Sequence, residues 1–548
     1  MAPYRFMLAA ALGGAYLLSS GRIPQWPVPG FLTAFAALLG TQVLAWAVWV
    51  VLLYPKLFSP LRGLPGPSGD SWFMGQWKTI VALPTGQPMR NWINSIPNEG
   101  IIRYLGPFNQ ERLFITTPKA LAEVLVTKNY EFIKPETMRY SIGRILGIGI
   151  LLAEGDEHKL QRKNLLPAFA FRHIKDLYPV FWAKSREGVQ AITEAILEDA
   201  AQRGDAERNT AVIEAGSWAS RITLDIIGVA GLGRDFDAIK NPNNRLTQAY
   251  ARIFKPSRQA RFLQLLSMMF SPRVAAWLPV KRNEDIGTSA RLIRAECAEL
   301  IQAKKQKLAQ KDASDPDILS VALESGGFTD ENLVDQLMTF LAAGHETTAS
   351  AMTWAVYLLA RHPEVQTRLR AEIREHLPAL SDDNNSSTVS SMDIDRMPYL
   401  NAVCSEILRY YSPAPLTLRK AACDTSIQGQ FVPKGTQVML VPWAVNKSEA
   451  LWGADAGVFN PDRWLAAASG GATSNYAYMT FLHGPRSCIG MSFAKGEFAC
   501  LLATWVGRFE MELHNKEEAD ESKIEIKGAV TARPAKGMYV KTTVVEGW

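Results

Sequence analysis

Cysteine is scarce in this chain, and its scarcity limits both the metal sites and the compartments that the sequence allows. The 548 residues include only five cysteines, and no two of them are spaced as Cys-x-x-Cys. Structural zinc sites and iron–sulfur clusters need such closely spaced thiolates, so neither is expected. An odd, sparse set also argues against a disulfide framework and for a reducing compartment.

Charge of one sign is not in large excess either. The 59 basic and 53 acidic residues give a formal net charge of +6, and the basic residues are scattered along the chain. A nucleic-acid-binding protein gathers its Lys and Arg into a face or stripe, so we expect no nucleic-acid partner. Hydrophobic residues make up 47% of the chain, which is ordinary for a globular protein and enough for a large core.

Residues 31–54 contain no charged residue and are rich in Leu, Ala, Val and Trp. About 20 consecutive apolar residues span a bilayer as a helix. Trp46, Trp49 and Tyr54 lie toward the downstream end of this run, where aromatic belts form. Lys56 follows, which indicates a cytoplasmic exit. We therefore predict a transmembrane helix over residues 31–54, and the alternative is a buried core helix.

A shorter apolar run, residues 6–18, is expected to form a second span or an interfacial helix. A cleaved signal peptide fits poorly, because a longer apolar run follows it. Together these segments form a predicted membrane anchor, residues 1–54. The prolines within residues 55–68 predict a stiff, non-helical hinge. No second linker follows, so residues 69–548 are predicted to form one catalytic domain.

Apolar residues at three- and four-residue spacing, with charged faces between them, predict that helices dominate this domain. Short β-branched and aromatic runs bounded by turn residues predict a few strands. The fold class is therefore predicted to be mainly α with small β-sheets. The helices are expected over residues 177–199, 213–232, 331–362 and 362–376, and the strands within residues 101–117 and 426–441.

One cysteine lies in a distinctive loop near the C-terminus, Phe481-Leu-His-Gly484-Pro-Arg486-Ser-Cys488-Ile-Gly490. Its two glycines allow positive φ and a close backbone approach to a flat cofactor. Arg486 can bind a carboxylate at two points, and backbone N–H groups of such a loop can hydrogen-bond a sulfur. The loop therefore suits a thiolate held against a metal, and the alternative is a buried free cysteine in a turn.

A second group of residues lies inside a predicted long helix. Gly344 is in its middle, where glycine costs about 1 kcal/mol relative to alanine. The hydroxyl of Thr347 can bond a carbonyl one turn back and bend the helix. We expect a groove there, beside which Glu346 and Thr347 can hand protons to bound oxygen. The alternative is an ordinary core helix with a tolerated glycine and a solvated Glu346.

Glu406 and Arg409 are three residues apart and therefore share one helix face. In isolation such a pair is usually a surface ion pair worth less than about 1 kcal/mol. Its neighbours in the sequence are apolar, however, and a partly buried charge pair needs further partners. Arg463, farther along the chain, is expected to complete a charge cluster.

These motifs resemble those of the cytochrome P450 family, and along the chain they follow the order of long helix, charge pair and cysteine loop. The loop matches F-x-x-G-x-R-x-C-x-G, the long helix matches A/G-G-x-D/E-T, and the charge pair matches E-x-x-R, each at every fixed position. The resemblance covers almost the whole chain and implies the cytochrome P450 fold with haem b as cofactor. It also implies that Cys488 is the iron ligand and Thr347 the oxygen-activating hydroxyl, with Glu346 as its acidic neighbour. Glu406, Arg409 and Arg463 correspond to a structural lock around the haem loop.

Haem propionates need cations, and the resemblance points to several. Arg162 lies in a segment similar to the family's propionate-binding helix, where W-x-x-x-R is usual, but His158 replaces the tryptophan. His158 is expected either to donate to a propionate or to be a partly exposed surface histidine. The complete predicted cofactor-binding set is Arg162, His158, Arg419, Arg486, Phe481, Gly484 and Gly490.

The resemblance also implies a redox partner. Lys159, Lys163 and Lys495 suggest a docking face for the acidic NADPH–cytochrome P450 reductase, with cytochrome b5 as a further donor. Plain solvated charge is the alternative. The anchor would place the chain in the endoplasmic-reticulum membrane with its catalytic domain facing the cytoplasm.

The predicted function is that of a membrane-bound haem-thiolate monooxygenase that inserts one oxygen atom from O₂ into a lipophilic small molecule, in fungal specialised metabolism. A thiolate-haem isomerase or dehydratase that needs no O₂ is a second hypothesis, against which the intact Thr347 argues. A non-catalytic haem-binding protein is a third. The lipophilic substrate is inferred from the mostly apolar segments expected to line the pocket, residues 130–152, 338–341, 413–418 and 530–534.

Overall fold

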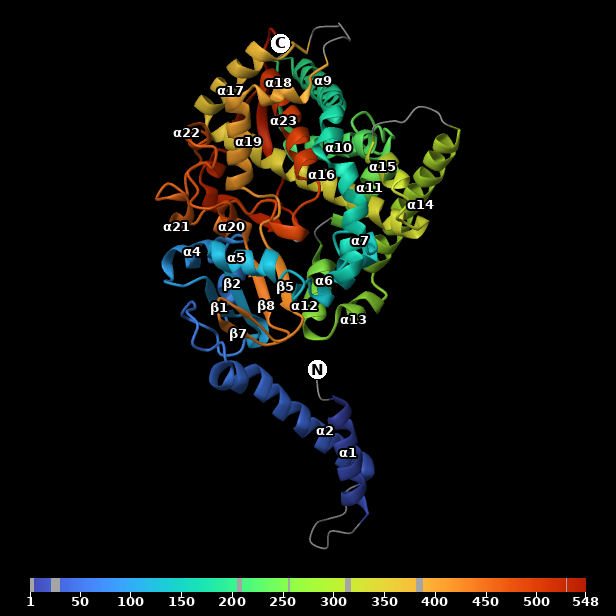
Figure 1. Cartoon of the computed structure of the whole chain (residues 1–548), viewed down its shortest axis with the longest axis vertical. Helices are drawn as coiled ribbons and strands as arrows, with labels where there is room; N and C mark the ends of the chain where they lie inside the picture. The colour runs from blue at the N-terminus through green and yellow to red at the C-terminus, as the bar shows by residue number, and fades with distance from the viewer. Residues whose placement is uncertain are drawn as a thin grey trace.

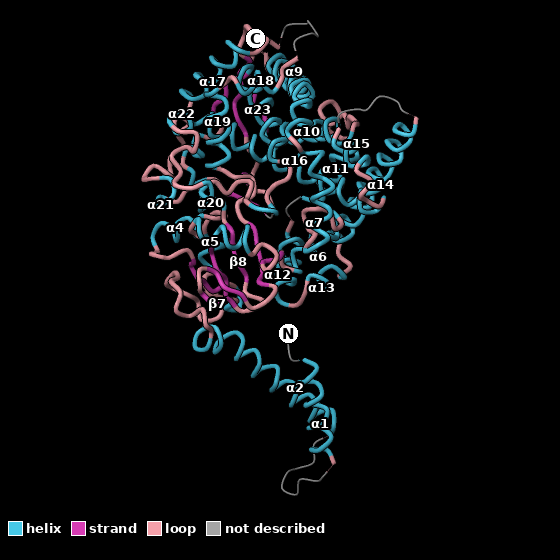
Figure 2. The backbone as a smooth tube through the Cα atoms, viewed as in Figure 1, coloured by secondary structure: helices cyan, strands magenta, loops and turns pink. Residues whose placement is uncertain are grey.

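The computed structural model describes residues 4–20, 30–204, 209–254, 257–310, 317–380, 388–528 and 530–548. Figure 1 shows a helical body with a sheet on one side of it, and two helices that extend away from the body at the N-terminal end. In Figure 2 the strands gather in two places, one beside β8 and one close to the C-terminus. The fold is therefore mainly α with small β-sheets, as predicted.

The long helix α16 (Asp330–Arg361) crosses the middle of the body (Figure 1). It begins at Thr329, whose side chain accepts the backbone N–H of Asn332 at 3.2 Å, and ends where Pro363 starts the next helix. Apolar residues on most of its faces are buried, which is expected of a helix enclosed by others. The helices α10 (Ala215–Ile226), α14 (Lys281–Ala309) and α23 (Met491–Arg508) pack against it.

A five-stranded sheet has the order β1-β2-β8-β5-β3, and only the β2–β8 pair is parallel. In the antiparallel β3–β5 pair, Phe132 lies opposite Ala421 and Ile133 opposite Lys420. The sheet therefore brings the chain after β3 next to Arg419. Its strands are β1 (Ile101–Leu105), β2 (Glu111–Ile115), β3 (Phe132–Ile133), β5 (Thr417–Ala421) and β8 (Gln437–Leu440).

The remaining strands form three smaller sheets, and in Figure 1 most of the other helices lie around α16, while α4 and α5 lie beside the five-stranded sheet. The strands are β4 (Thr210–Glu214), β12 (Tyr539–Val544) and β9 (Phe509–Leu513), then β10 (Ile526–Gly528) with β11 (Ala532–Pro534), and β6 (Thr425–Ile427) with β7 (Gln430–Val432). The principal helices are α4 (Gln87–Ser95), α6 (Glu136–Leu146), α7 (Gly155–Leu165), α9 (Tyr178–Gln202), α11 (Arg245–Phe254), α12 (Arg258–Met269), α13 (Pro272–Trp277), α15 (Ile318–Glu324), α17 (Pro363–His376) and α19 (Pro398–Tyr410). Shorter helices are α3 (Trp77–Ala82), α5 (Pro118–Ala122), α8 (Phe171–Ile174), α18 (Ser391–Asp395), α20 (Pro442–Val445), α21 (Glu449–Trp452) and α22 (Arg463–Ala466).

The helix expected over residues 213–232 begins later than predicted. Its first residues belong to β4, because that strand pairs with β12 from the other end of the chain. The helix α10 starts at Ala215, after the side chain of Glu214 accepts the backbone N–H groups of Gly216 and Ser217. Long-range strand pairing therefore overrides the local helical pattern.

Two helices form the N-terminal segment. The short run over residues 6–18 is the helix α1 (Tyr4–Ser19), which packs against α2 (Phe31–Val48). The second helix continues as a π-helix, η1 (Trp49–Phe58). Among the described residues, one helix, Phe31–Phe58, is long and apolar enough to cross a membrane.

The expectation that helix is excluded from residue 55 onward is wrong, because η1 contains Pro55 and runs to Phe58. Proline lacks an N–H and its ring crowds the carbonyl one turn back, that of Val51, and this carbonyl accepts a hydrogen bond from the Asn109 side chain at 2.8 Å instead. The end of this helix is also held by the body. Arg103 donates to the Pro55 carbonyl at 2.5 Å.

Candidate active site

The loop before α23 holds Cys488 in a defined position. Its backbone N–H donates to the Phe481 carbonyl at 2.9 Å, and Phe481 itself is half-buried. The Cys488 thiol is exposed, yet burial is the main cause of its raised pKa, which the backbone N–H of Gly490 and the Arg162 guanidinium partly offset. Both observations are explained if the thiol borders a space that protein encloses.

The two glycines of this loop differ in backbone conformation and in what a side chain there would meet. Gly484 has φ +76°, as predicted, but a Cβ there would come within 2.3 Å of the Leu125 carbonyl oxygen. Its lack of a side chain lets the loop pack closely on the backbone before β3. Gly490 has φ −88° and its Cβ would make an ordinary 3.7 Å contact with Phe169. Positive φ is therefore not the reason for glycine at 490.

The middle of α16 presents an open stretch on an otherwise buried helix. Ala343 is exposed, and Gly344, Glu346 and Thr347 are partly exposed. The hydroxyl of Thr347 donates to the Ala343 carbonyl at 2.7 Å, as the sequence suggested. The helix is continuous through this point, and Gly344 makes room for Ile227, whose Cγ1 would lie 2.9 Å from a Cβ there.

Glu346 is ionised by a partner that the sequence did not reveal. Arg533, from β11, donates to its carboxylate at 2.6 Å and to its backbone carbonyl at 2.9 Å. Burial favours the neutral carboxyl, but Arg533 and His345 outweigh it and lower the pKa of Glu346 to about 2. The acidic neighbour of Thr347 is therefore a paired carboxylate, not a solvated one.

Positive charge gathers beside the Cys488 loop. Arg486 forms an ion pair with Glu154 and donates to the Phe132 carbonyl at 3.2 Å, while its Nε has no hydrogen-bond partner among the residues that the structure describes. Arg419, on β5, is buried, and burial together with Arg486 lowers its pKa to about 10. The structure thus brings Arg419 and Arg486 together around a single carboxylate.

Lys134 adds a third buried cation that the sequence analysis missed. It follows β3 and is only 7% exposed. Burial, followed by repulsion from Arg419, lowers its pKa to about 7, and Glu154 opposes the shift only in part. No motif marks this lysine, and its place in the cluster arises from the pairing of β3 with β5.

His158 and Arg162, both on α7, face this cluster. His158 is buried rather than partly exposed at the surface, and its Nδ1 lies 3.2 Å from the Tyr130 hydroxyl. Burial and the surrounding cations, Arg486 first, lower its pKa to about 4, so it is neutral. Arg162 donates to the Ser487 carbonyl at 2.6 Å and thereby ties α7 to the residue before Cys488.

The charge cluster around Glu406 is fully buried. Arg409 donates two bonds to the carboxylate, and neither side chain has any solvent exposure. Arg463, on α22, completes the cluster at 3.4 Å. The sequence did not predict two further donors to this carboxylate, the backbone N–H of Asn460 at 2.8 Å and the indole N–H of Trp464 at 2.9 Å.

These features fit haem, because each can be matched to a part of that group. The Cys488 thiol would hold the iron, and the open stretch of α16 would leave room for a small bound molecule. The group also carries two carboxylates, and the cluster of Lys134, Arg419 and Arg486 holds more positive charge than Glu154 balances. The unpartnered Nε of Arg486 is a donor for such an anion.

Comparison with known proteins decides the family. A model of the cytochrome P450 family matches residues 65–541. The chain belongs to the cytochrome P450 family. It is 46% identical over 544 residues to "Cytochrome P450 monooxygenase FUM15" of Gibberella moniliformis, with 91% of each chain covered. It is also 46% identical over 523 residues to "Cytochrome P450 monooxygenase sphH" of Aspergillus fumigatus (94% of each) and 42% identical over 556 residues to "Cytochrome P450 monooxygenase ALT8" of Alternaria alternata (92% of this chain, 93% of the relative).

The cofactor of this cytochrome P450 is therefore haem bound through a cysteine thiolate, and the protein is a monooxygenase by family. The segments predicted to line the substrate pocket differ in solvent exposure. Phe340 and Leu341 are buried core residues of α16, whereas Leu416 is half-buried and Val530 is 44% exposed.

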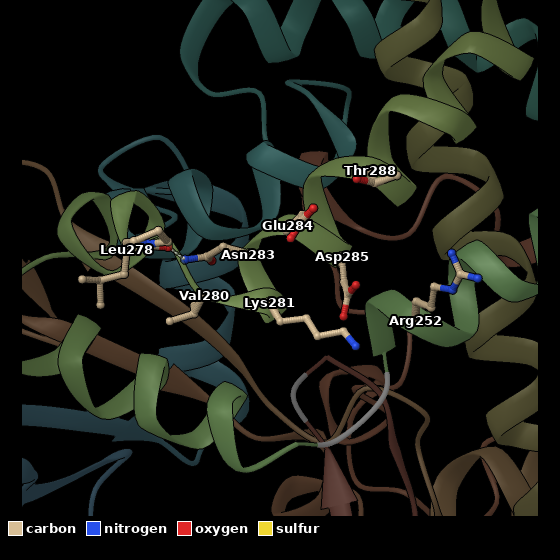
Figure 3. Close-up of a pocket in the computed structure, with 9 residues that line it drawn as sticks. Arg252, Leu278, Val280, Lys281, Asn283, Glu284, Asp285 and Thr288 are labelled. Atoms are coloured by element: carbon tan, nitrogen blue, oxygen red, sulfur yellow. Dashed lines mark hydrogen bonds between the residues drawn. The ribbon is translucent and has the colours of Figure 1, made fainter.

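A separate cavity of about 640 Å³ lies away from these residues, between α11 and the start of α14. Its walls carry both charges, and in Figure 3 the side chains of Lys281 and Asp285 extend toward each other, with Arg252 standing to one side. It contains none of the predicted site residues. Its charged lining differs from the apolar lining typical of a pocket for a lipophilic ligand.

Proposed function

We propose that this cytochrome P450 is a membrane-bound monooxygenase that inserts one oxygen atom from O₂ into a lipophilic small molecule in fungal secondary metabolism. The observation that carries the proposal is the exposed Cys488 thiol in a defined loop, whose pKa is raised by burial, with the Gly490 N–H and Arg162 partly offsetting that rise. The names and fungal sources of the relatives support it.

Cys488 is proposed as the iron ligand, and the neighbouring cations as the anchors of the propionates. Lys134, Arg419 and Arg486 would share the two carboxylates, while the neutral His158 donates a single hydrogen bond. When bound, haem supplies oxygen activation, and the thiolate favours cleavage of the O–O bond. Phe481, Gly484 and Gly490 shape the loop that holds the thiol.

Glu346 and Thr347 are proposed to move protons on the opposite side of the site. Thr347 presents its hydroxyl beside the exposed Ala343, and Glu346 lies one residue before it as a carboxylate. A hydroxyl and a carboxylate so placed can pass protons inward without admitting bulk water. This arrangement favours the monooxygenase over an isomerase or dehydratase, which needs no proton delivery to O₂.

The electrons are proposed to come from NADPH–cytochrome P450 reductase, with cytochrome b5 as an alternative donor. Lys163 and Lys159 are exposed on α7, the helix that Arg162 ties to the Cys488 loop. Lys159 is paired with Asp156 at 2.8 Å, which weakens its part in a docking face. Lys495 lies 5.7 Å from the Phe481 ring, close behind the same loop. The proposed membrane is that of the endoplasmic reticulum, with the body on the cytoplasmic side.

Reconstitution in lipid vesicles tests the proposal. The purified full-length protein, with reductase and NADPH, is expected to oxidise members of a panel of lipophilic compounds that shift its Soret band. Product should carry one oxygen atom from ¹⁸O₂. Conversion that proceeds without NADPH and O₂ would support the isomerase or dehydratase instead. Soret shifts without any conversion would support a haem-binding protein with no catalytic role.

A further inference from the structure

The loop between α6 and α7, residues 147–154, is bound to the first turns of α16 by side chains of that helix. The backbone N–H of Ile148 donates to Oδ2 of Asp335 at 2.8 Å. Two residues later, the N–H of Ile150 donates to Oε1 of Gln336 at 2.9 Å. Two neighbouring side chains of one helix therefore hold two backbone groups of the loop, and neither of them is among the predicted site residues.

Two glycines allow the backbone of this loop to come so close to the helix. A Cβ at Gly147 would collide with the Asp335 carboxylate. One at Gly149 would collide with the Thr339 hydroxyl and would lie 2.7 Å from the Asp335 carbonyl oxygen. Gly147 also has φ +74°, a conformation that favours glycine. The contact with α16 is therefore specified by the sequences of both the loop and the helix.

The α16 residues that hold the loop lead directly to the open stretch of the helix. Asp335, Thr339 and Ala343 follow at four-residue spacing, so they lie on successive turns of one ridge. The loop packs on the first two of these residues, whereas Ala343 is exposed. At its other end the loop reaches Glu154, whose carboxylate pairs with Arg486. The loop thus runs from the edge of the open stretch to the cations proposed to bind the propionates.

Asp335 also binds a third element of the fold. Nη2 of Arg294, on α14, lies 2.5 Å from Oδ1 of Asp335, while Oδ2 of the same carboxylate holds the loop. The side chain of Asp335 is 15% exposed, so this ion pair is largely shielded from solvent on its acidic side. A shift of α14 would therefore pull on the carboxylate that positions the loop.

We propose that Asp335 is a positioning residue that sets substrate selectivity, by holding the loop 147–154 at the edge of the open stretch and tying it to α14. The loop overlaps the segment predicted to line the pocket, and its Leu151 is apolar and half-buried. An apolar site discriminates by shape, roughly 10–200-fold for one methylene, so it needs a boundary that does not yield. The inference rests on the proposed function, whose lipophilic substrate would meet this boundary.

The test separates the two bonds of the carboxylate. Asp335→Ala removes both, whereas Asp335→Asn keeps an acceptor for the Ile148 N–H and loses the charge that binds Arg294. Asp330→Ala is the matched control, because it removes an exposed ion pair from the same helix. Hydrogen–deuterium exchange of residues 147–153 in the holoenzyme reports how firmly the loop is held. Soret titrations and kcat/KM with lipophilic compounds of graded length report selectivity.

In Asp335→Ala the loop should exchange on the order of tenfold faster, since its N–H loses a charged acceptor. The preference for the best compound over its longer homologues should fall on the order of tenfold, with an unchanged reduced-CO spectrum. Asp335→Asn should lie between this variant and wild type in selectivity, and Asp330→Ala should match wild type. Unchanged loop exchange in Asp335→Ala would overturn the proposal. An equal loss for every compound would overturn it too, because a merely structural role predicts that result.

Gly149→Ala covers the case in which Asp335→Ala does not fold, since its Cβ displaces the loop from the other side of the same contact. Gly287→Ala, on α14, is its control, because a Cβ there meets nothing within 4 Å. Wild-type selectivity in Gly149→Ala would overturn the proposal. Absence of NADPH-dependent product in the wild type would instead refute the proposed function, and loop exchange with the Soret titrations would still decide this inference.

Discussion

Glu406 and Arg409 form a two-point ion pair with no solvent exposure on either side chain: Nε to Oε2 is 2.8 Å and Nη2 to Oε1 is 2.7 Å. The remaining donors of Arg409 bind the carbonyls of Asn446, Ala456 and Val458. One guanidinium therefore fixes α19 to three points of the chain that leads toward the Cys488 loop. The pair therefore holds α19 and this segment in a fixed arrangement.

Arg409→Ala should destabilise the protein by about 3–5 kcal/mol, because it leaves the Glu406 carboxylate buried beside fewer partners. Arg368→Ala is the matched control, since its ion pair with Asp462 is about half exposed on both sides and is worth less than about 1 kcal/mol. Chemical unfolding and the ratio of haem to protein measure the two effects. Equal losses in both variants would show that burial of the pair has no energetic consequence.

Cys488→Ser should abolish the reduced-CO absorption that is typical of thiolate ligation, because the serine hydroxyl is not a thiolate donor. Cys423→Ser, which changes an exposed cysteine, should leave the band unchanged. Difference spectra of both variants against wild type give the answer. If the band survives in Cys488→Ser and is lost when another cysteine is changed, that other cysteine is the iron ligand.

Lys134→Met should change the pH dependence of stability in the haem-free protein. The pKa of Lys134 is about 7 when folded and 10.5 when unfolded. Between these values unfolding takes up a proton, so the free energy of unfolding should rise with pH in the wild type. The variant lacks this contribution, and its Tm should rise less between about pH 7 and 9. Lys163→Met, at an exposed position on α7, should retain the wild-type slope.

Lys134 also leads us to expect that haem binding is accompanied by proton uptake. An anionic propionate close to Lys134 favours the charged ammonium, so haem binding near neutral pH should take up a proton. Haem affinity should then fall as the pH rises in wild type and fall less in Lys134→Met. Identical slopes in the two proteins would remove Lys134 from the propionate site.

Deletion of residues 1–54 should release the protein from membranes and leave its reduced-CO spectrum unchanged, whereas deletion of residues 1–30 should keep it membrane-bound. The first deletion removes most of the helix Phe31–Phe58 but retains Pro55, which Arg103 binds. Membrane fractionation and spectra distinguish the two. Loss of haem from the shorter protein would show that this helix supports the body.

N-glycosylation tests the proposed cytoplasmic orientation. The chain has three acceptor sequons, at Asn384, Asn385 and Asn446, and they are not equally informative. Asn446 is buried and donates to Thr480 at 2.9 Å, so a missing glycan there says nothing of topology. Asn384 and Asn385 lie outside the described residues and remain the informative positions. A glycan on either in the full-length protein would place the body in the lumen.

Local pattern carried much of the fold and the site. The spacing of apolar residues predicted α9, α16 and α17 to within a few residues, because each of these helices buries a continuous stripe. The Glu406–Arg409 pair followed from three-residue spacing and apolar neighbours, since a charge placed there must find partners.

Contacts across the chain could not be read in the same way. Lys134 reaches the site because β3 pairs with the distant β5, and Arg533 because β11 packs against α16, and no spacing in the sequence encodes either contact. The glycines show a related limit. Their presence was evident, but what each one meets was not: Gly484 meets the Leu125 carbonyl and Gly344 meets Ile227. A glycine in the sequence can indicate that a side chain would not fit at that position. Which neighbouring atom occupies the space depends on tertiary packing.

The docked end of the N-terminal helix has a mechanical consequence. Asn109 donates to the Val51 carbonyl at 2.8 Å, and Arg103 binds the Pro55 carbonyl one turn later. The helix is therefore attached to the body at two points, which fixes its direction relative to the body. When a helix attached in this way spans a bilayer, its tilt sets the orientation of the body relative to the membrane and the distance of the body from it. Helices adjust their tilt to hydrocarbon thickness. Bilayer thickness would therefore change the orientation of the body, including the exposed face of α7 that carries Lys163, without changing a single residue.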